Sequence, residues 1–105
     1  MFSLHNKVIV LTGATGALGG SLVLSLTEAK AKIVILGRNQ SLLDALLTKI
    51  SPSTESAAFV VDVLDKKSLE EVKNQIIKQF GHIDILINAV GGNLPGAVIS
   101  DDQSI

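Results

Sequence analysis

The sequence predicts a single α/β domain, in which a parallel sheet carries helices on both faces. Short apolar runs rich in β-branched residues recur along the chain, as expected for strands. Between these runs, apolar residues repeat every three or four positions, which is the spacing of one face of a helix. The runs are apolar along most of their length, which is typical of strands that are buried on both faces and joined by helical connections. A chain of 105 residues, 47% of them hydrophobic, can bury one such core and is too short for two domains.

Strands and helices alternate along the predicted chain in the order β-α-β-α-β-α-β. We expect the strands at residues 7–11, 32–36, 57–61 and 83–87. Right-handed connections between parallel strands then predict the sheet order 3-2-1-4, the first half of a Rossmann-type fold. Residues 92–105 show no comparable pattern, and we expect them to form an irregular tail.

The helix boundaries follow from capping residues. The first predicted helix covers residues 16–29, and Lys30 then stands where glycine is favoured, at a cost of about 1 kcal/mol if its backbone is left-handed. Ser41 is the expected N-cap of the second helix, and Asp65 is that of the third, which ends at Gly81. The three apolar faces comprise Leu18, Leu22, Leu26 and Ala29; Leu43, Leu46, Leu47 and Ile50; and Leu69, Val72, Ile76 and Phe80.

The composition and net charge argue against several classes of partner and binding site. A net charge of −1 without a basic tract argues against nucleic acid or an anionic membrane as a partner. The absence of cysteine excludes disulfides and thiolate metal sites, and neither His5 nor His82 has a partner at ligand spacing. The pair Asp101 and Asp102 lacks a surrounding ligand set, so we expect no metal site. No apolar run approaches the ~20 residues of a membrane span, and no signal peptide is apparent, so we expect a cytoplasmic protein.

A glycine-rich stretch follows the first predicted strand. Gly13, Gly16 and Gly19 recur at every third position between that strand and the first helix. The first glycine allows a sharp turn, the second lets a ligand approach the backbone, and the third lets the helix pack closely on the strand. With the N–H groups and the dipole of the helix, this arrangement predicts a pyrophosphate site. The alternative is that the glycines serve the tight turn alone.

This stretch resembles a pattern of the short-chain dehydrogenase/reductase family. Residues 12–19, TGATGALG, fit T-G-x-x-x-(A/G)-x-G, and they also fit T-G-x-x-G-x-x-G of the extended branch, which includes epimerases. Residues 86–92, LINAVGG, resemble the N-N-A-G segment of the single-domain branch, with Ala89 and Val90 departing from it. The segment VVDVLD is similar to the one in which an aspartate, here Asp62, reaches the adenine. The resemblance extends from about residue 4 to residue 95.

The resemblance implies an NAD(P) cofactor. The residues assigned to it are Gly13, Thr15, Gly16, Ala17, Leu18, Gly19, Arg38, Asn39, Asp62, Val63, Asn88, Ala89 and Gly91. An NAD site typically has an acidic residue after the second strand, whereas this chain has Arg38, which suits the 2′-phosphate of NADP. Two observations weigh against NADP: Arg38 can also be an ordinary solvated residue, and Thr15 stands where many NADP-preferring relatives have a basic residue. We expect NADP, with NAD as the alternative.

The resemblance also implies hydride transfer between the nicotinamide and a small carbonyl or alcohol substrate. Relatives use a tyrosine, a lysine, a serine and an asparagine for proton transfer and substrate binding. This chain has no tyrosine, so we assign no catalytic residue and expect a nucleotide-binding portion of a longer oxidoreductase, inactive alone. An apolar edge at the fourth strand predicts a homo-oligomer.

Residues 91–97, GGNLPGA, are similar to a subgroup related to fructuronate reductases (D-mannonate oxidoreductases), which act on sugar acids. An unrelated carbonyl reductase is the competing interpretation of this segment. A non-catalytic dinucleotide-binding module and a fragment of an extended-branch epimerase or dehydratase are the alternatives for the whole chain.

Overall fold

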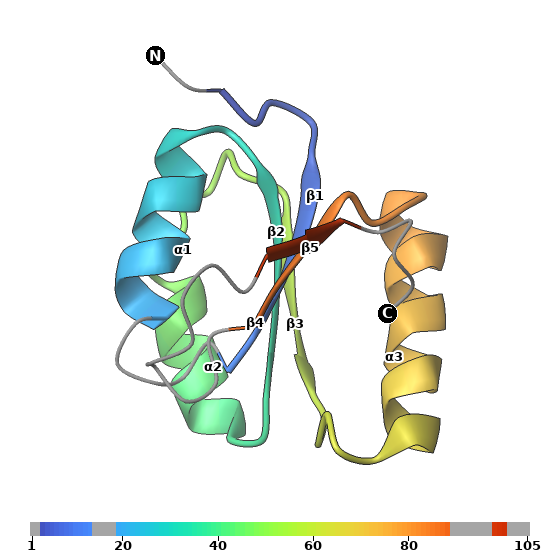
Figure 1. Cartoon of the computed structure of the whole chain (residues 1–105). Helices are drawn as coiled ribbons and strands as arrows, with labels where there is room; N and C mark the ends of the chain where they lie inside the picture. The colour runs from blue at the N-terminus through green and yellow to red at the C-terminus, as the bar shows by residue number, and fades with distance from the viewer. Residues whose placement is uncertain (1–2, 14–18, 89–97, 101–105) are drawn as a thin grey trace.

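The computed structural model describes residues 3–13, 19–88 and 98–100. All four predicted strands and all three predicted helices are present, and the strand boundaries differ from the prediction by no more than two residues (Figure 1). The elements are β1 (Val8–Thr12), α1 (Gly19–Glu28), β2 (Lys32–Gly37), α2 (Gln40–Leu47), β3 (Ser56–Val60), α3 (Lys66–Phe80), β4 (Ile85–Asn88) and β5 (Val98–Ser100).

The sheet has the order β3-β2-β1-β4-β5. Strands β1 to β4 pair in parallel, which confirms the predicted order 3-2-1-4. The fifth strand is a correction to the irregular tail expected over residues 92–105, because Val98–Ser100 pair antiparallel with β4. The outer edge of β4 offers unpaired N–H and C=O groups, and a short β-branched run can satisfy them. The edge expected to be open at β4 is therefore paired.

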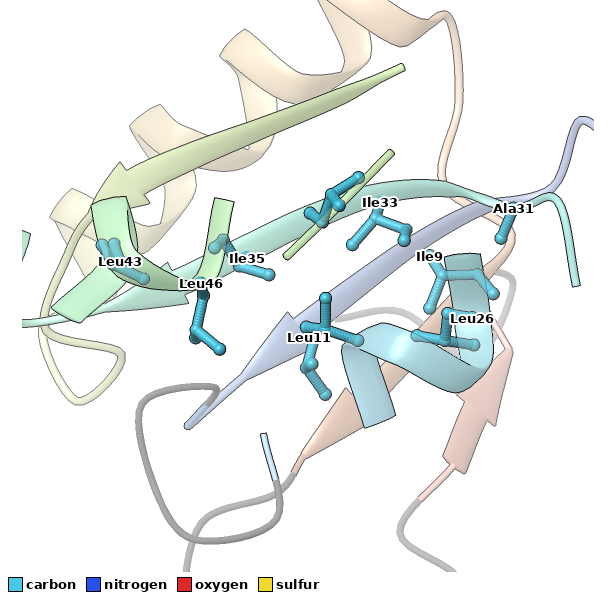
Figure 2. Packing of buried hydrophobic residues seen from close by; sticks show 10 residues of the cluster. Ile9, Leu11, Leu26, Ala31, Ile33, Ile35, Leu43 and Leu46 are labelled. Atoms are coloured by element: carbon cyan, nitrogen blue, oxygen red, sulfur yellow. The ribbon is translucent and has the colours of Figure 1, made fainter. Parts of the chain in front are cut away.

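The core lies on both faces of the sheet (Figure 1). Helices α1 and α2 cover one face and α3 covers the other, so successive residues of each central strand enter opposite clusters. In β1, Ile9 and Leu11 pack with the α1 and α2 side, whereas Val8 and Val10 pack with the α3 side. Figure 2 shows the first cluster, which includes Ile9, Leu11, Leu26, Ala31, Ile33, Ile35, Leu43 and Leu46.

The helices bury the faces that the spacing predicts, with one adjustment. The buried residues of α2 and α3 belong to the predicted faces: Leu43, Leu46, Val72, Ile76 and Phe80. In α1 the buried apolar side chains are Val23 and Leu26, while Leu22 is only partly buried. The buried face of α1 thus keeps Leu26 of the predicted stripe but includes Val23 in place of Leu22.

The N-caps of α2 and α3 test two local predictions. Asp65 caps α3, as predicted, and accepts a hydrogen bond from the Ser68 backbone N–H at 3.2 Å. The N-cap of α2 is Asn39 and not Ser41, because the extended backbone of Asn39 lets its Oδ1 accept from the Leu42 N–H at 3.1 Å. Ser41 therefore lies inside the first turn of α2.

At the end of α1 the backbone of Lys30 is left-handed, with φ of 71°, which is the strained case of the two that the sequence leaves open. The Lys30 N–H donates to the Thr27 carbonyl at 3.0 Å and the Ala31 N–H to the Leu26 carbonyl at 3.2 Å. This pair of bonds is a Schellman motif, and Ala31 and Leu26 are both buried beneath it. Lysine thus occupies the position that most often carries glycine.

Candidate functional site: the carboxyl edge of the parallel strands

The carboxyl ends of the four parallel strands form one edge of the sheet. Thr12, at the end of β1, is in register with Leu36 of β2 and with Asn88 of β4. On the other side of β2, Gly37 is in register with Val60 of β3. The chain leaves β1 through α1 on one face and reaches β4 from α3 on the other, so the connections reverse between β1 and β4 (Figure 1). Open α/β sheets bind ligands beside such a reversal.

Gly13, the first glycine of the pattern, lies directly after β1. Gly13 has φ of 68°, a left-handed conformation that is strained for a residue with a side chain. Helix α1 begins at Gly19, which is buried, and its first turn contains no acidic residue. The positive end of the α1 dipole is therefore not neutralised by its own first turn, which favours an anion there. Four predicted site residues of this turn lie outside the described residues: Thr15, Gly16, Ala17 and Leu18.

A side-chain hydrogen bond joins the two strands at the reversal. The Thr12 hydroxyl donates to Asn88 Oδ1 at 3.1 Å, and only 6% of Thr12 is exposed. The bond fixes the orientation of the Asn88 amide at the carboxyl edge. Thr12 is not among the predicted site residues, although a polar residue that ends an otherwise apolar strand is a signal for one. The predicted residues Ala89 and Gly91 follow Asn88 outside the described part of the chain.

Arg38 and Asn39 lie directly after β2. Both are exposed, and none of the ion pairs among the described residues involves Arg38. Asn39 was assigned to the cofactor, but its Oδ1 is engaged in capping α2. Arg38 is thus placed to meet a ligand, whereas Asn39 also has a structural role.

Asp62 and Val63 occupy the turn between β3 and α3. Because Asp65 caps α3, Asp62 is left out of that cap, as predicted. Asp62 instead accepts a hydrogen bond from the Leu64 N–H at 3.0 Å through Oδ1, and its side chain remains exposed. Val63 is half-buried and packs against the cluster beneath α3. The turn is therefore held by its own hydrogen bonds while the Asp62 carboxylate faces solvent.

The N-cap hydrogen bonds of α3 lower the pKa of Asp65. The backbone N–H and the hydroxyl of Ser68 donate to its carboxylate, at 3.2 and 3.0 Å, and these bonds lower the pKa of Asp65 below its ordinary value. The cause is capping, so this shift marks a structural residue and not a catalytic acid.

Two further findings concern the described part of the chain alone. Within residues 3–13, 19–88 and 98–100, no group of three histidine or acidic side chains is placed to hold a metal ion. In the same residues, no helix is long and apolar enough to cross a membrane.

The chain is similar in sequence to known oxidoreductases. The profile of the family described as short chain dehydrogenase matches residues 7–104. An uncharacterised oxidoreductase of Haemophilus influenzae is 40% identical over 101 residues, which are 95% of this chain and 35% of that protein. The uncharacterised oxidoreductase UxuB of Bacillus subtilis is 38% identical over 97 residues, covering 91% of this chain and 35% of its own length.

Solved structures agree with these matches. A protein from Haemophilus influenzae described as a candidate D-mannonate oxidoreductase, solved with bound NAD, is 39% identical with a TM-score of 0.79, over 90% of this chain and 34% of that one. A 2-keto-3-deoxy-D-gluconate dehydrogenase from Streptococcus agalactiae is 33% identical with a TM-score of 0.76, over 86% and 34% of the two chains. An NAD+-bound xylitol dehydrogenase is 27% identical with a TM-score of 0.75, over 79% and 32%.

The chain thus spans about a third of the length of each of these relatives. Its parallel strands, its glycine turn and the match over residues 7–104 agree, and the chain belongs to the short-chain dehydrogenase family.

Proposed function

We propose that this chain is the dinucleotide-binding part of an oxidoreductase that transfers a hydride between NADP and a small carbonyl or alcohol substrate. The observation that carries the proposal is the left-handed turn at Gly13, which leads from the carboxyl end of β1 towards an α1 start free of acidic residues. This turn lies beside the reversal between β1 and β4, where α/β sheets of this kind bind ligands. The NAD-bound structures of two structural relatives support the same ligand class.

The residues of the carboxyl edge fit the parts of a dinucleotide. We assign the pyrophosphate to the turn over residues 13–19, the adenine to Asp62 and Val63, and the remaining contacts to the segment that begins at Asn88. When bound, the cofactor supplies the hydride acceptor or donor. The chain itself binds and orients this cofactor, and the exposed Asp62 carboxylate is suited to accept from the adenine amino group.

We propose NADP as the preferred cofactor. Arg38 is the residue after β2, and no acidic side chain stands there to accept from a ribose 2′-hydroxyl. An exposed guanidinium suits a 2′-phosphate, to which it can donate two hydrogen bonds at once. NAD is the second candidate, because two structural relatives were solved with it.

We propose a sugar acid as the substrate of the whole protein. The named substrates of two relatives, D-mannonate and 2-keto-3-deoxy-D-gluconate, are both sugar acids. The 105 residues contain no tyrosine, the family's proton donor, so we expect this chain to bind the cofactor without turning over substrate.

Calorimetric titration of NADPH and NADH tests the proposal. We expect both to bind, NADPH more tightly, and Arg38→Ala to weaken NADPH by about tenfold while changing NADH little, because a hydrogen bond to a charged group is lost. Lys49→Ala removes an exposed positive charge just after α2 and is the matched control, with no expected change for either nucleotide. Equal weakening of both nucleotides by Arg38→Ala would refute the preference for NADP, and failure of the unmodified chain to bind either would refute the function.

A further inference from the structure

We infer that Asp84 sets the register of β4 on β1 and thereby positions Asn88 beside Thr12 at the carboxyl edge. Asp84 precedes β4, at the end of the strand opposite the candidate site. Its effect on cofactor binding rests on the function proposed above, whereas its effect on strand register does not.

The geometry at the amino end of the two strands carries the inference. Asp84 Oδ2 accepts a hydrogen bond from the Val8 backbone N–H at 2.8 Å, and the Asp84 N–H donates to the Val8 carbonyl at 2.9 Å. Both polar groups of the Val8 backbone are thus satisfied by one residue. Val8 is fully buried, so its N–H has no access to water and needs an acceptor within the protein.

A second side chain holds the Asp84 carboxylate. His82 Nε2 lies 2.7 Å from the same Oδ2 atom. The Asp84 side chain is 23% exposed and that of His82 is 53% exposed, so the pair lies at the surface above a buried backbone group. His82 therefore restrains the carboxylate in the position that meets Val8.

The apolar pattern of β4 does not by itself fix its register. Its residues Ile85, Leu86 and Ile87 are all large, apolar and half-buried. A slip by one residue would exchange the two faces of the strand, yet it would again place aliphatic side chains in both clusters. The register of β4 on β1 therefore depends on specific hydrogen bonds at the ends of the two strands.

Two such bonds bracket the pairing of β1 with β4. Asp84 meets Val8 at the amino end, and Thr12 meets Asn88 at the carboxyl end. Between them the strands run in register from Ile9 with Ile85 to Thr12 with Asn88. A slip by one residue would bring Ile87 or Ala89 opposite Thr12, and the acceptor for its hydroxyl would be lost.

The test compares Asp84→Leu, which keeps the branched shape but removes the acceptor, with Asp84→Asn, which keeps an acceptor oxygen. Asp65→Ala is the control, because it removes another carboxylate that accepts a backbone N–H, but at the start of α3. Nuclear Overhauser contacts between β1 and β4 report the register, amide exchange reports the Val8 hydrogen bond, and NADPH titration reports the site. In the unmodified chain, a scalar coupling between the Val8 nitrogen and the Asp84 carboxyl carbon detects the bond without any substitution.

We expect the coupling to be present, and we expect Asp84→Leu to speed exchange at Val8 and weaken NADPH by about tenfold. Asp84→Asn should retain most of the exchange protection at Val8 and most of the NADPH affinity. Asp65→Ala should leave the β1–β4 contacts unchanged. Absence of the coupling, or unaltered β1–β4 contacts in a folded Asp84→Leu chain, would overturn the inference. If the unmodified chain binds no nucleotide, the proposed function fails, while the coupling and the strand contacts still decide the role of Asp84.

Discussion

The left-handed backbone of Lys30 is a local source of strain in the fold. Its left-handed backbone closes α1 through the two hydrogen bonds of a Schellman motif. Lysine has a Cβ atom that opposes this conformation, and glycine does not. The sequence reveals the conflict, since the helix must end before β2 and no glycine is available at its end.

Replacing Lys30 with glycine is expected to raise the free energy of unfolding by about 1 kcal/mol, because the left-handed backbone is no longer strained. Lys30→Ala is the matched control: it removes the same charge but keeps the Cβ atom, and should bring no comparable gain. Urea denaturation of the three proteins measures the difference. A glycine variant no more stable than the alanine variant would contradict the assigned strain.

Among the helices and strands, helix caps and the short edge strand are the features that the sequence predicts least well. The cap of α3 could be predicted because Asp65 is well placed at the start of a clear apolar stripe. The cap of α2 could not, because Asn39 and Ser41 are both good caps and the choice depends on where β2 ends. The strand β5 was missed because its three residues carry no periodicity and gain their order from the edge of β4.

The Asp65 cap is expected to make folding depend on acidity. The pKa of Asp65 is lower in the folded chain than its ordinary value, so the cap stabilises fully above that value and is lost as pH falls through the folded pKa. Asp65→Asn keeps an oxygen acceptor that does not titrate, so its unfolding free energy should fall less steeply with acid. Urea denaturation between about pH 6 and pH 2 compares the two chains. If the unfolding free energies of the unmodified chain and of Asp65→Asn fall equally with acid, titration of Asp65 does not affect the stability of the fold.

At the scale of the molecule, the central strands are buried more deeply than β4. Ile35 of β2 is fully buried between the layers, whereas Ile87 of β4 is half-buried. The order of the sheet was predictable because right-handed connections leave few alternatives. The bonds of the candidate site were not, because Thr12 and Asn88 are 76 residues apart in the chain and meet only in the folded sheet.

This difference in burial predicts a difference in stability. Ile35→Ala is expected to lower the free energy of unfolding by about 3–4 kcal/mol, since it leaves a cavity in a closed core. Ile87→Ala makes the same chemical change at a half-exposed site and should cost clearly less. Equilibrium unfolding in urea measures both, and equal losses would contradict the described burial of β4.

The carboxyl edge of the parallel strands is proposed to hold a dinucleotide, and amide chemical shifts during titration with NADPH locate the bound nucleotide. We expect the shifts to concentrate at Gly13, Arg38, Asp62 and Asn88. The opposite edge of the sheet offers a groove lined by Lys30, Lys32, Ser53 and Glu55, among others, and should stay unchanged. Shifts that concentrate in that groove, or no shifts at millimolar nucleotide, would show that the carboxyl edge does not bind the dinucleotide.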